Sequence, residues 1–484
     1  MKSRILVLFS LMLFVSLNAY AQFPEDALRL AETGYGMSAR SISMGNAMTG
    51  LSQGFDATFF NPAGLAQSRQ SEVTMGLNFL GHADNATYLG TNTSTSSTQT
   101  DLTSLGLVYP FPTTKGSFVI SFGYNRGTDF NSALSFNGFN PYSSIIPSLY
   151  NSDTTLDIPY MLYLEDYAGN PLITDSVQQN GTEQRTGGIN RWSAAMGLDV
   201  AQDFSIGITL NLLSGSYNYT RTFTETDTRG IYNYSPLYFS SFVLKNTDNQ
   251  DISGWNAKVG LLYRVRDMSG NTIARFGATV TFPSYYTITD NFNDKGWAYS
   301  TYYPSLSYAP YPGNNSYDVT TPIKLGIGAS GGTSQLTLAA DLEYADYSQL
   351  QFSNSNLPAD FISSLNSQIK QEFRGALTLR GGVEFAVTNP NYSLLVPYLR
   401  VGGEYIQSPY VNDGTNQAQK FLSGGVGVRV QNSISFDVAY QYGWWDTSSL
   451  EYSYYTGANK YVSQSTSNEK ITNSNVVLTF KYDF

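Results

Sequence analysis

The chain has 484 residues, a formal net charge of −10, no Cys and a single His. The acidic balance argues against nucleic acid as a partner, and the lack of Cys excludes disulfides and thiolate metal sites. Only 13% of the residues are charged, whereas 14% are aromatic, including 37 Tyr. Ordinary soluble domains carry about 25% charged residues, and Tyr is favoured where an apolar wall meets water. The composition therefore departs from that of a soluble protein.

Residues 1–21 have the features of a secretory signal peptide. Lys2 and Arg4 precede an apolar run over residues 5–17, and Ala19-Tyr20-Ala21 supplies a cleavage site with small residues at its first and third positions. The apolar run is too short to span a membrane comfortably, so we expect cleavage before Gln22 rather than a membrane anchor. No later apolar run reaches about 18 residues, so the sequence offers no transmembrane helix.

Alternating apolar and polar residues predict strands from residue 71 to the end of the chain. Successive side chains of a strand point to opposite faces, and about 14 segments show this period. In the last one, Val476, Leu478 and Phe480 share a face, and the chain ends on Phe484. An aromatic residue at the end of such a strand is typical of bacterial outer-membrane barrels. We therefore predict an all-β fold, a transmembrane antiparallel β-barrel over residues 71–484.

The polar faces of these strands carry many charges, and periodicity alone does not say whether they face water or a lumen. The connections between strands help, because they alternate between short turns and long loops. That asymmetry is typical of outer-membrane barrels, with the long loops outside, and an even number of strands then places both termini in the periplasm. The short turns lie near 112–116, 202–203, 268–271, 331–334, 389–393 and 432–433, and the long loops near 82–100, 128–190, 221–252, 286–318, 351–372, 408–419 and 451–470.

Residues 22–70 do not follow the strand pattern. Pro24-Glu25-Asp26 predicts the start of a short helix that runs through Ala27 to Glu32, and a stretch rich in Gly, Ser and Ala follows. The alternatives are a disordered periplasmic tail and a plug inside the barrel. The plug is favoured because a solvated tail would not carry so many apolar side chains. These are Met37, Ile42, Met44, Leu51, Phe55, Phe59 and Phe60.

The same segment resembles the N-terminal hatch of the FadL/TodX family of outer-membrane transporters for long-chain fatty acids and aromatic hydrocarbons. The likeness lies in Ser38-Ala39-Arg40, Met44-Gly45-Asn46-Ala47 and Asp56-Ala57, and above all in the hatch motif Asn61, Pro62, Ala63 and Gly64, followed by Leu65. The resemblance implies a 14-stranded barrel with the hatch in its lumen. It also implies passive uptake of a hydrophobic small molecule across the outer membrane of a Gram-negative bacterium.

The family's mechanism implies three steps in the passage of the ligand. It would land on the outer loops, move to a pocket beside the hatch and leave sideways at a kinked third strand. Here the third strand is Ser117 to Gly127, with Gly123 as the candidate kink. The loop at 128–190 would be the landing site, although its apolar residues could equally pack that loop onto its neighbours. The candidate contacts are Ile145, Ile146, Leu149, Tyr150, Ile158, Tyr160, Met161, Leu162 and Tyr163.

The sequence does not favour catalysis. His82 is the one His, near Asp84 at the outer end of the first strand, and we interpret it as a polar rim residue. Asp341 and Glu343 share a strand face, which indicates ion pairs rather than acid–base chemistry. No metal motif is present, and we expect no cofactor. Spacing over Leu357 to Phe373 predicts a short loop helix.

The partners that we expect are the lipid bilayer of the outer membrane and a hydrophobic small molecule, and we expect a monomer. An alternative function remains open, because a branch of the family serves protein secretion or surface assembly with a similar hatch and barrel. Under that alternative, exported proteins would be the partners.

Overall fold

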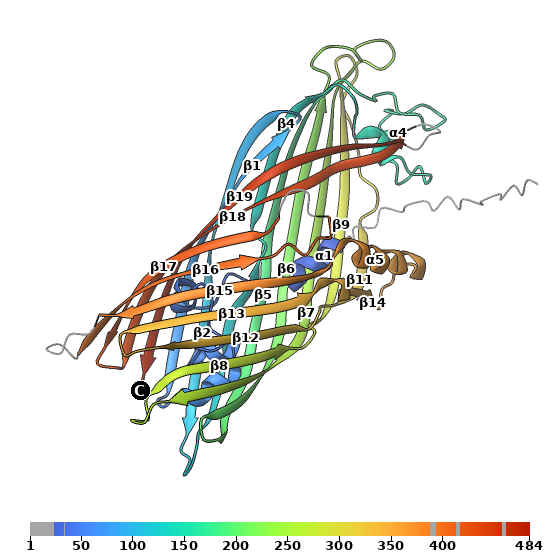
Figure 1. Cartoon of the computed structure of the whole chain (residues 1–484). Coiled ribbons are helices and arrows are strands. Elements are labelled where there is room, and N and C mark those ends of the chain that lie inside the picture. The colour runs from blue at the N-terminus through green and yellow to red at the C-terminus, as the bar shows by residue number, and fades with distance from the viewer. Residues whose placement is uncertain (1–23, 33, 388–393, 413–416, 457–460) are drawn as a thin grey trace, which may run out of the picture.

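The computed structural model describes residues 24–32, 34–387, 394–412, 417–456 and 461–484. The predicted signal peptide and the predicted turn at 389–393 lie outside the described residues. One antiparallel sheet closes on itself, because β1 (Glu72–Tyr88) pairs with both β2 (Thr91–Phe111) and β19 (Tyr461–Asp483). The result is the predicted 14-stranded barrel (Figure 1).

The sheet has 19 segments because four barrel strands are interrupted and one short segment lies in a loop. The interrupted strands are β3 (Phe118–Asp129) with β4 (Ser132–Asn140), β8 (Thr272–Thr281) with β9 (Tyr285–Ser300), β11 (Gly313–Thr320) with β12 (Lys324–Gly332), and β13 (Leu336–Asp346) with β14 (Gln351–Ser353). Besides β1, β2 and β19, the uninterrupted strands are β5 (Val177–Ala201), β6 (Phe204–Thr226), β7 (Phe239–Arg266), β15 (Gly375–Ala386), β16 (Leu395–Ile406), β17 (Gln419–Val430) and β18 (Ile434–Thr456). The short segment is β10 (Leu306–Tyr308), which pairs with β9.

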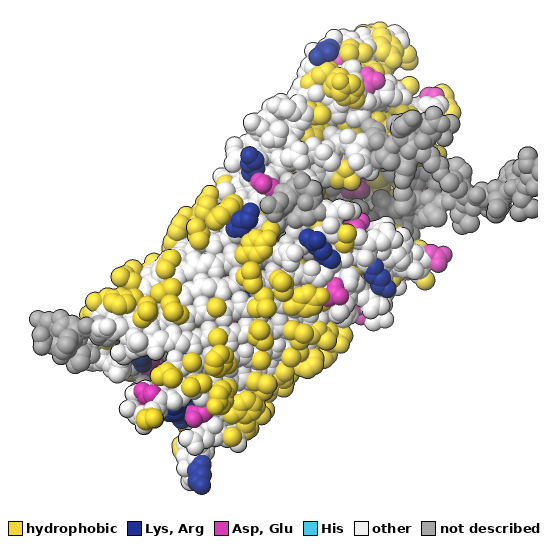
Figure 2. Space-filling view, in the orientation of Figure 1, with side chains coloured by type: hydrophobic (Ala, Val, Ile, Leu, Met, Phe, Trp, Pro, Cys, Tyr) yellow, Lys and Arg dark blue, Asp and Glu magenta, His cyan; other side chains and the backbone are white. Residues whose placement is uncertain are grey.

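The barrel is apolar outside and polar inside. Phe122 and Leu212 on the outer wall are 57% and 68% exposed, whereas Arg264 and Arg400 inside are 5% and 8% exposed. In water this arrangement would be unfavourable, because the apolar outer surface would be solvated while the charged side chains were buried. The outer surface of the barrel therefore faces lipid. Figure 2 shows the apolar belt around the lower part of the barrel, with charged side chains below and above it. No helix among the described residues is long and apolar enough to cross a bilayer.

Several predicted long loops are in fact strands. β5, β6 and β7 contain 25, 23 and 28 residues and run far beyond the apolar belt, so that their outer parts enter the regions 128–190 and 221–252 predicted as loops. The region 286–318, also predicted as a loop, contains most of β9 and part of β11. The region 82–100 is likewise a β1–β2 hairpin. Sequence patterning missed these extensions because both faces there are polar, as in Thr91–Thr100, so no apolar period marks them. The barrel wall is therefore much taller on this side (Figure 1).

The loops at the end of the barrel opposite the short turns carry short helices. α5 (Ala359–Glu372) is the loop helix that the sequence predicts, and its Leu365 and Ile369 are buried. The others are η2 (Ile146–Leu149), α4 (Ile158–Met161) and η3 (Tyr347–Gln349).

The N-terminal segment lies inside the barrel and crosses it from wall to wall. It consists of α1 (Pro24–Ala31), α2 (Ala39–Ser43), α3 (Phe55–Phe59) and η1 (Pro62–Gln67). α2 packs on β16–β19, whereas η1 packs on β3 and β5–β7. α1 covers the range in which the sequence predicts a helix. We call residues 34–67 the hatch.

The two ends of the described chain lie at opposite ends of the barrel. Phe484 lies at the short-turn end, where its carbonyl accepts from the Ser71 amide at 3.1 Å, as expected. α1, however, contacts α5 at the long-loop end. The even strand number fixes where β1 begins, but the segment before it runs back up the lumen. The expectation that both termini are periplasmic stays a prediction.

Candidate functional site in the barrel lumen

The hatch motif forms hydrogen bonds both within the hatch and to the barrel wall. The Asn61 side chain donates to the carbonyls of Thr49 at 2.8 Å and Leu261 at 3.0 Å, and its oxygen accepts from the Ala63 amide at 3.2 Å. It thereby caps η1, and Pro62 takes the first helical position, where its missing N–H is harmless. One buried amide therefore joins two hatch segments to β7.

The hatch backbone packs closely against glycines of the barrel strands. A Cβ added to Gly207 would lie 2.3 Å from the Pro62 carbonyl carbon, and one added to Gly402 would lie 2.2 Å from the Gly45 amide nitrogen. Real Cβ atoms do not come this close to backbone atoms. Because a side chain at either position would push the hatch away, the strands and the hatch backbone fit without a gap there.

Charged side chains clamp α2 to the opposite wall. Arg40 makes two hydrogen bonds to Glu384, Nε–Oε2 at 2.9 Å and Nη2–Oε1 at 3.0 Å. Glu384 also pairs with Arg400, which in turn pairs with Asp437. Nearby, Arg380 lies 3.6 Å from Glu343, the ion pair that the sequence indicates. Asp341 instead accepts from the Thr49 amide at 2.7 Å, so it holds the hatch rather than a cation.

Beside the hatch lies a cavity of about 70 Å³, enough for several water-sized groups. Its lining contains apolar side chains, four cations and three carboxylates. Lys258 donates to the Phe59 carbonyl at 2.6 Å, Lys324 donates to the Ala31 carbonyl at 2.7 Å, and Arg191 stacks 5.1 Å from the Phe59 ring. The large apolar lining residues are Leu30, Phe59, Phe60, Phe282 and Tyr286, and the charged ones are Arg191, Lys258, Lys324, Arg380, Glu32, Glu343 and Glu404.

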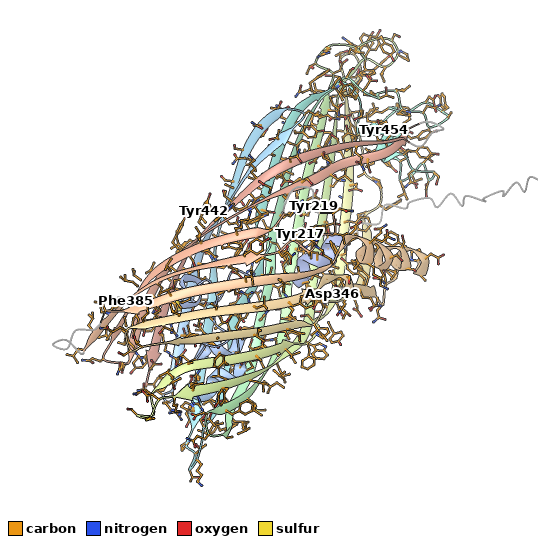
Figure 3. The ribbon with its side chains drawn as sticks, viewed as in Figure 1. Tyr217, Tyr219, Asp346, Phe385, Tyr442 and Tyr454 are labelled. Carbon is orange, nitrogen blue, oxygen red and sulfur yellow. The ribbon has the colours of Figure 1, made fainter. Side chains whose placement is uncertain are left out.

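α1 covers this cavity at the long-loop end. Its Leu28 and Leu30 are buried in an apolar cluster with residues of β5–β7, β9, β11, β14 and α5. Arg29 pairs with Asp26 at 2.9 Å, donates to Gln250 at 3.1 Å and lies 3.5 Å from the ring centre of Tyr217, labelled in Figure 3. A ligand that reaches the cavity from this end must therefore pass or move α1.

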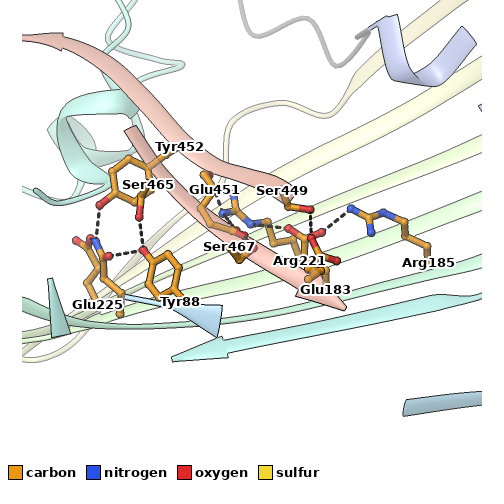
Figure 4. Close-up of polar contacts among 12 residues, drawn as sticks. Tyr88, Glu183, Arg185, Arg221, Glu225, Ser449, Glu451, Tyr452, Ser465 and Ser467 are labelled. Atoms are coloured by element: carbon orange, nitrogen blue, oxygen red, sulfur yellow. Dashed lines mark hydrogen bonds and ion pairs between the residues drawn. The ribbon is translucent and has the colours of Figure 1, made fainter. Parts of the chain in front are cut away.

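Further up, polar side chains close the tall part of the lumen (Figure 4). Arg221 of β6 pairs with Glu451 of β18 at 3.0 Å, across the barrel. Tyr88 donates to Gln179 at 2.6 Å, and Gln179 donates to the buried Glu225 at 2.7 Å. These contacts join side chains from different strands inside the upper part of the barrel.

The third strand is irregular at Gly127. At Gly123 the pairing with both neighbouring strands is in regular register, whereas the register with β5 shifts between Arg126 and Thr128. The ladder between β2 and β3 ends at Ser104 and Asn125, although both strands continue. Residues 91–103 of β2 therefore lie beside β3 and β4 without a described backbone ladder to them, and we call this boundary the seam. Gln99 of β2 bridges the seam by donating to Asp129 at 2.9 Å.

The seam begins at the upper edge of the lipid belt and touches the N-terminal segment. Leu105, beside Ser104, faces outward and is 45% exposed, and Leu102, the cross-strand partner of Leu77, follows it on the same face of β2. A Cβ on Gly34 would lie 2.0 Å from the Gly127 carbonyl oxygen. The cavity, which Gly34 also lines, is therefore next to the seam.

The candidate landing residues divide into two groups. Ile145, Ile146, Ile158 and Leu162 are buried within the loop cluster at the tall end. Tyr150, Met161 and Tyr163 are exposed, and Leu149 and Tyr160 are half-buried. Only the second group can meet a ligand from solution without rearrangement of the loops.

Sequence reasoning missed two elements of the site. Lys258 and Lys324 lie on the polar faces of their strands, but nothing in the sequence places them beside Phe59 and Ala31 at one cavity. The role of α1 as a cover was also not predicted. His82, interpreted as a rim residue, is buried with its Nδ1 3.0 Å from the Asn473 side-chain oxygen. Among the described residues no three His, Asp or Glu side chains are grouped to hold a metal ion.

The fold defines a class, the closed 14-stranded antiparallel barrel, and solved structures share that fold. A Pseudomonas aeruginosa FadL homologue is 13% identical, with a TM-score of 0.58 over 93% of this chain and 98% of that one. The P. putida toluene transporter TodX is also 13% identical, with a TM-score of 0.54 over 93% and 99%. The CymD monoaromatic hydrocarbon channel gives 13% and 0.50 over 93% and 98%.

No family model matches the chain, and a search of curated proteins finds no match. At 13% identity the structural likeness shows the fold alone. The resemblance in the hatch motif thus coincides with a shared architecture.

Proposed function

We propose that this protein lies in the outer membrane of a Gram-negative bacterium and takes up hydrophobic small molecules by diffusion. The observation that carries the proposal is the cavity beside the hatch, which is lined by both apolar and cationic side chains. The fold that it shares with hydrocarbon channels supports the same function.

The path has three parts. A ligand lands on the exposed Tyr150, Met161 and Tyr163 at the tall end and enters beside α5, where α1 covers the cavity. It moves into the cavity and leaves through the seam beside Gly127 into the outer edge of the bilayer. The hatch motif keeps the lumen closed toward the periplasm.

The cavity lining favours a long-chain fatty acid over a plain hydrocarbon. Its charged side chains are four cations and three carboxylates, which leaves one positive charge in excess. A fatty-acid carboxylate would bring one negative charge to this lining and balance that excess, whereas a hydrocarbon would bring none. The apolar lining then receives the beginning of the acyl chain.

The test is binding of oleate and of toluene to the purified protein, with Lys258→Gln and Lys324→Gln variants. A charged hydrogen bond contributes about 2 kcal/mol, so oleate affinity should fall roughly tenfold or more while toluene affinity stays unchanged. Lys245→Gln is the matched control, because Lys245 is exposed on the outer face of β7. Equal oleate binding by all variants would overturn the assignment of the cavity. A protein that retains no lipid and co-purifies with exported proteins would favour the secretion role.

A further inference from the structure

A buried carboxylate without partners lies in the loop region between β4 and β5. The Glu165 side chain belongs to a residue that is only 6% exposed, and neither of its oxygens has a hydrogen-bond partner among the described residues. A buried ionised carboxylate is costly unless a cation or hydrogen-bond donors neutralise it. Glu165 therefore needs a neutralising group.

No basic side chain of its own segment can supply one. The chain contains no Lys, Arg or His between Arg126 and Arg185. The charged groups that act on Glu165 are Asp157 and Asp166, both carboxylates, and burial together with these charges raises the pKa of Glu165 to about 8. The surroundings of Glu165 are therefore acidic.

Neighbouring β9 does not offer a cation from its packed face either. α4 rests on β9 at Gly296, where an added Cβ would meet Ile158 and Leu162. Lys295 is next in sequence, so its side chain points to the opposite face of the strand, where it lies 4.9 Å from the Trp297 ring.

Asp157 and Glu165 face the same short piece of chain. Asp157 is 1% exposed, and its Oδ2 accepts from the Asn151 amide at 2.9 Å. The Tyr150 ring and Glu165 Oε2 both lie within 4 Å of the position of a Gly169 Cβ, at 2.8 and 3.9 Å. The chain turns back between the two carboxylates, because the Leu164 amide donates to the Pro159 carbonyl at 2.9 Å.

We propose that Glu165 and Asp157 form a calcium site on the outer surface of the protein. Calcium is a hard cation that takes six to eight oxygen ligands and accepts backbone carbonyls and water beside carboxylates. It therefore does not need three acidic side chains, whereas zinc and similar metals would require His or Cys, which this segment lacks. A site with two carboxylates resembles those of extracellular modules, with a Kd of about 0.1–1 mM.

Calcium would fix the loop that carries Met161 and Tyr163. α4 begins at the Asp157 cap, and the exposed Tyr163 lies two residues before Glu165. With the cation bound, these side chains become a preorganised surface. The preorganised surface matters only if the ligand lands on Met161 and Tyr163, as the proposed function has it. The calcium site itself does not depend on that function.

The experiment is hydrogen exchange of the full-length protein in detergent, stripped with a chelator and then titrated with calcium chloride or magnesium chloride. We expect calcium, and not magnesium at the same concentration, to slow exchange at least tenfold over residues 150–172, with exchange elsewhere unchanged. Glu165→Gln should lose this effect, and Asp157→Asn should weaken it at least tenfold in apparent affinity. Asp175→Asn, an acidic residue of the same loop region outside the pair, should respond like the wild type.

Three results would overturn the site. In the first, calcium does not change hydrogen exchange in the wild type. In the second, calcium slows exchange in Glu165→Gln as much as in the wild type. In the third, calcium has no effect, and calcium-free Glu165→Gln exchanges more slowly than the calcium-free wild type. The last would mean that Glu165 is simply held neutral by its proton. Exchange in the barrel strands reports whether each variant is folded, and the magnesium comparison on the wild type needs no variant.

Discussion

Arg40 of the hatch and Glu384 of the barrel wall form a bidentate ion pair, with both nitrogen–oxygen distances within 3.0 Å. Glu384 keeps a second partner in Arg400. The pair joins α2 to β15, whereas Asn61 joins the other end of the hatch to β7. The hatch is thus fastened at two opposite points of the barrel.

Arg40→Ala should loosen one of these points without unfolding the barrel. Loss of the charged hydrogen bonds costs about 2 kcal/mol each, but Glu384 stays paired with Arg400, so no carboxylate is left alone. We expect ion conductance in planar bilayers to rise well above that of the wild type. Arg429→Ala is the control, because Arg429 pairs with Asp483 near a short turn and does not touch the hatch. Equal conductance of the two variants would show that α2 is held by packing alone.

Gly207→Ala should displace η1 from the wall. The new Cβ would meet the Pro62 carbonyl carbon at 2.3 Å, and such overpacking costs about 1–3 kcal/mol. Gly424→Ala is a matched control in another strand, since its Cβ would lie 3.6 Å from the nearest atom, an ordinary contact. Protease cleavage within the hatch should increase for the first variant only. If both resist alike, the wall yields at Gly207 and the close fit has no mechanical role.

Asn61→Asp should be more harmful than Asn61→Ala. Either change removes the amide hydrogens that Asn61 donates to the carbonyls of Thr49 and Leu261. Each carbonyl left without a donor lowers the stability of the folded state by about 1–3 kcal/mol. Asp in addition places carboxylate oxygens against those carbonyl oxygens. The order of leak conductance should therefore be Asp, then Ala, then wild type. Asn92→Asp, at an exposed hairpin tip, should match the wild type. The reverse order for Asp and Ala would mean that the amide donors are dispensable.

The sequence predicts the barrel well where one face is apolar. Phe480 and Leu478 alternate with polar residues, and β19 follows as expected. It fails for Thr91–Thr100, because hydroxyl side chains on both faces carry no period, yet the hairpin forms through its backbone ladder with β1. The height of the wall, and with it the closed upper lumen, therefore could not be read from periodicity.

The site was predicted in part. Asn61 and Pro62 carry a motif, so their position in the plug was accessible from the sequence. The convergence of Lys258 on β7 with Lys324 on β12 depends on where the hatch backbone runs, which no local pattern encodes. The irregularity of the third strand is at Gly127 rather than at Gly123, because a glycine becomes a bulge only where the register changes.

Glu225 should make the closed upper lumen pH-dependent. It is fully buried, and desolvation raises its pKa to about 7 from 4.5, against the opposing hydrogen bonds from Ser144, Ile145 and Gln179. A raised pKa means that the folded loops prefer the protonated form. Their stability is therefore complete below about pH 4.5 and falls as the pH rises through 7, by about 3 kcal/mol in all.

Hydrogen exchange over residues 140–147 measures this local stability, because the opening of a loop cluster need not unfold the barrel. Exchange corrected for the intrinsic effect of pH should show less protection at pH 8 than at pH 5. Glu225→Gln should flatten the profile, since its amide is neutral at both values and can still accept from the Ile145 amide. Asp267→Asn, at an exposed short turn, should leave the profile unchanged. Protection that rises from pH 5 to pH 8 would mean that the three hydrogen bonds outweigh burial and that Glu225 is ionised when the lumen is closed.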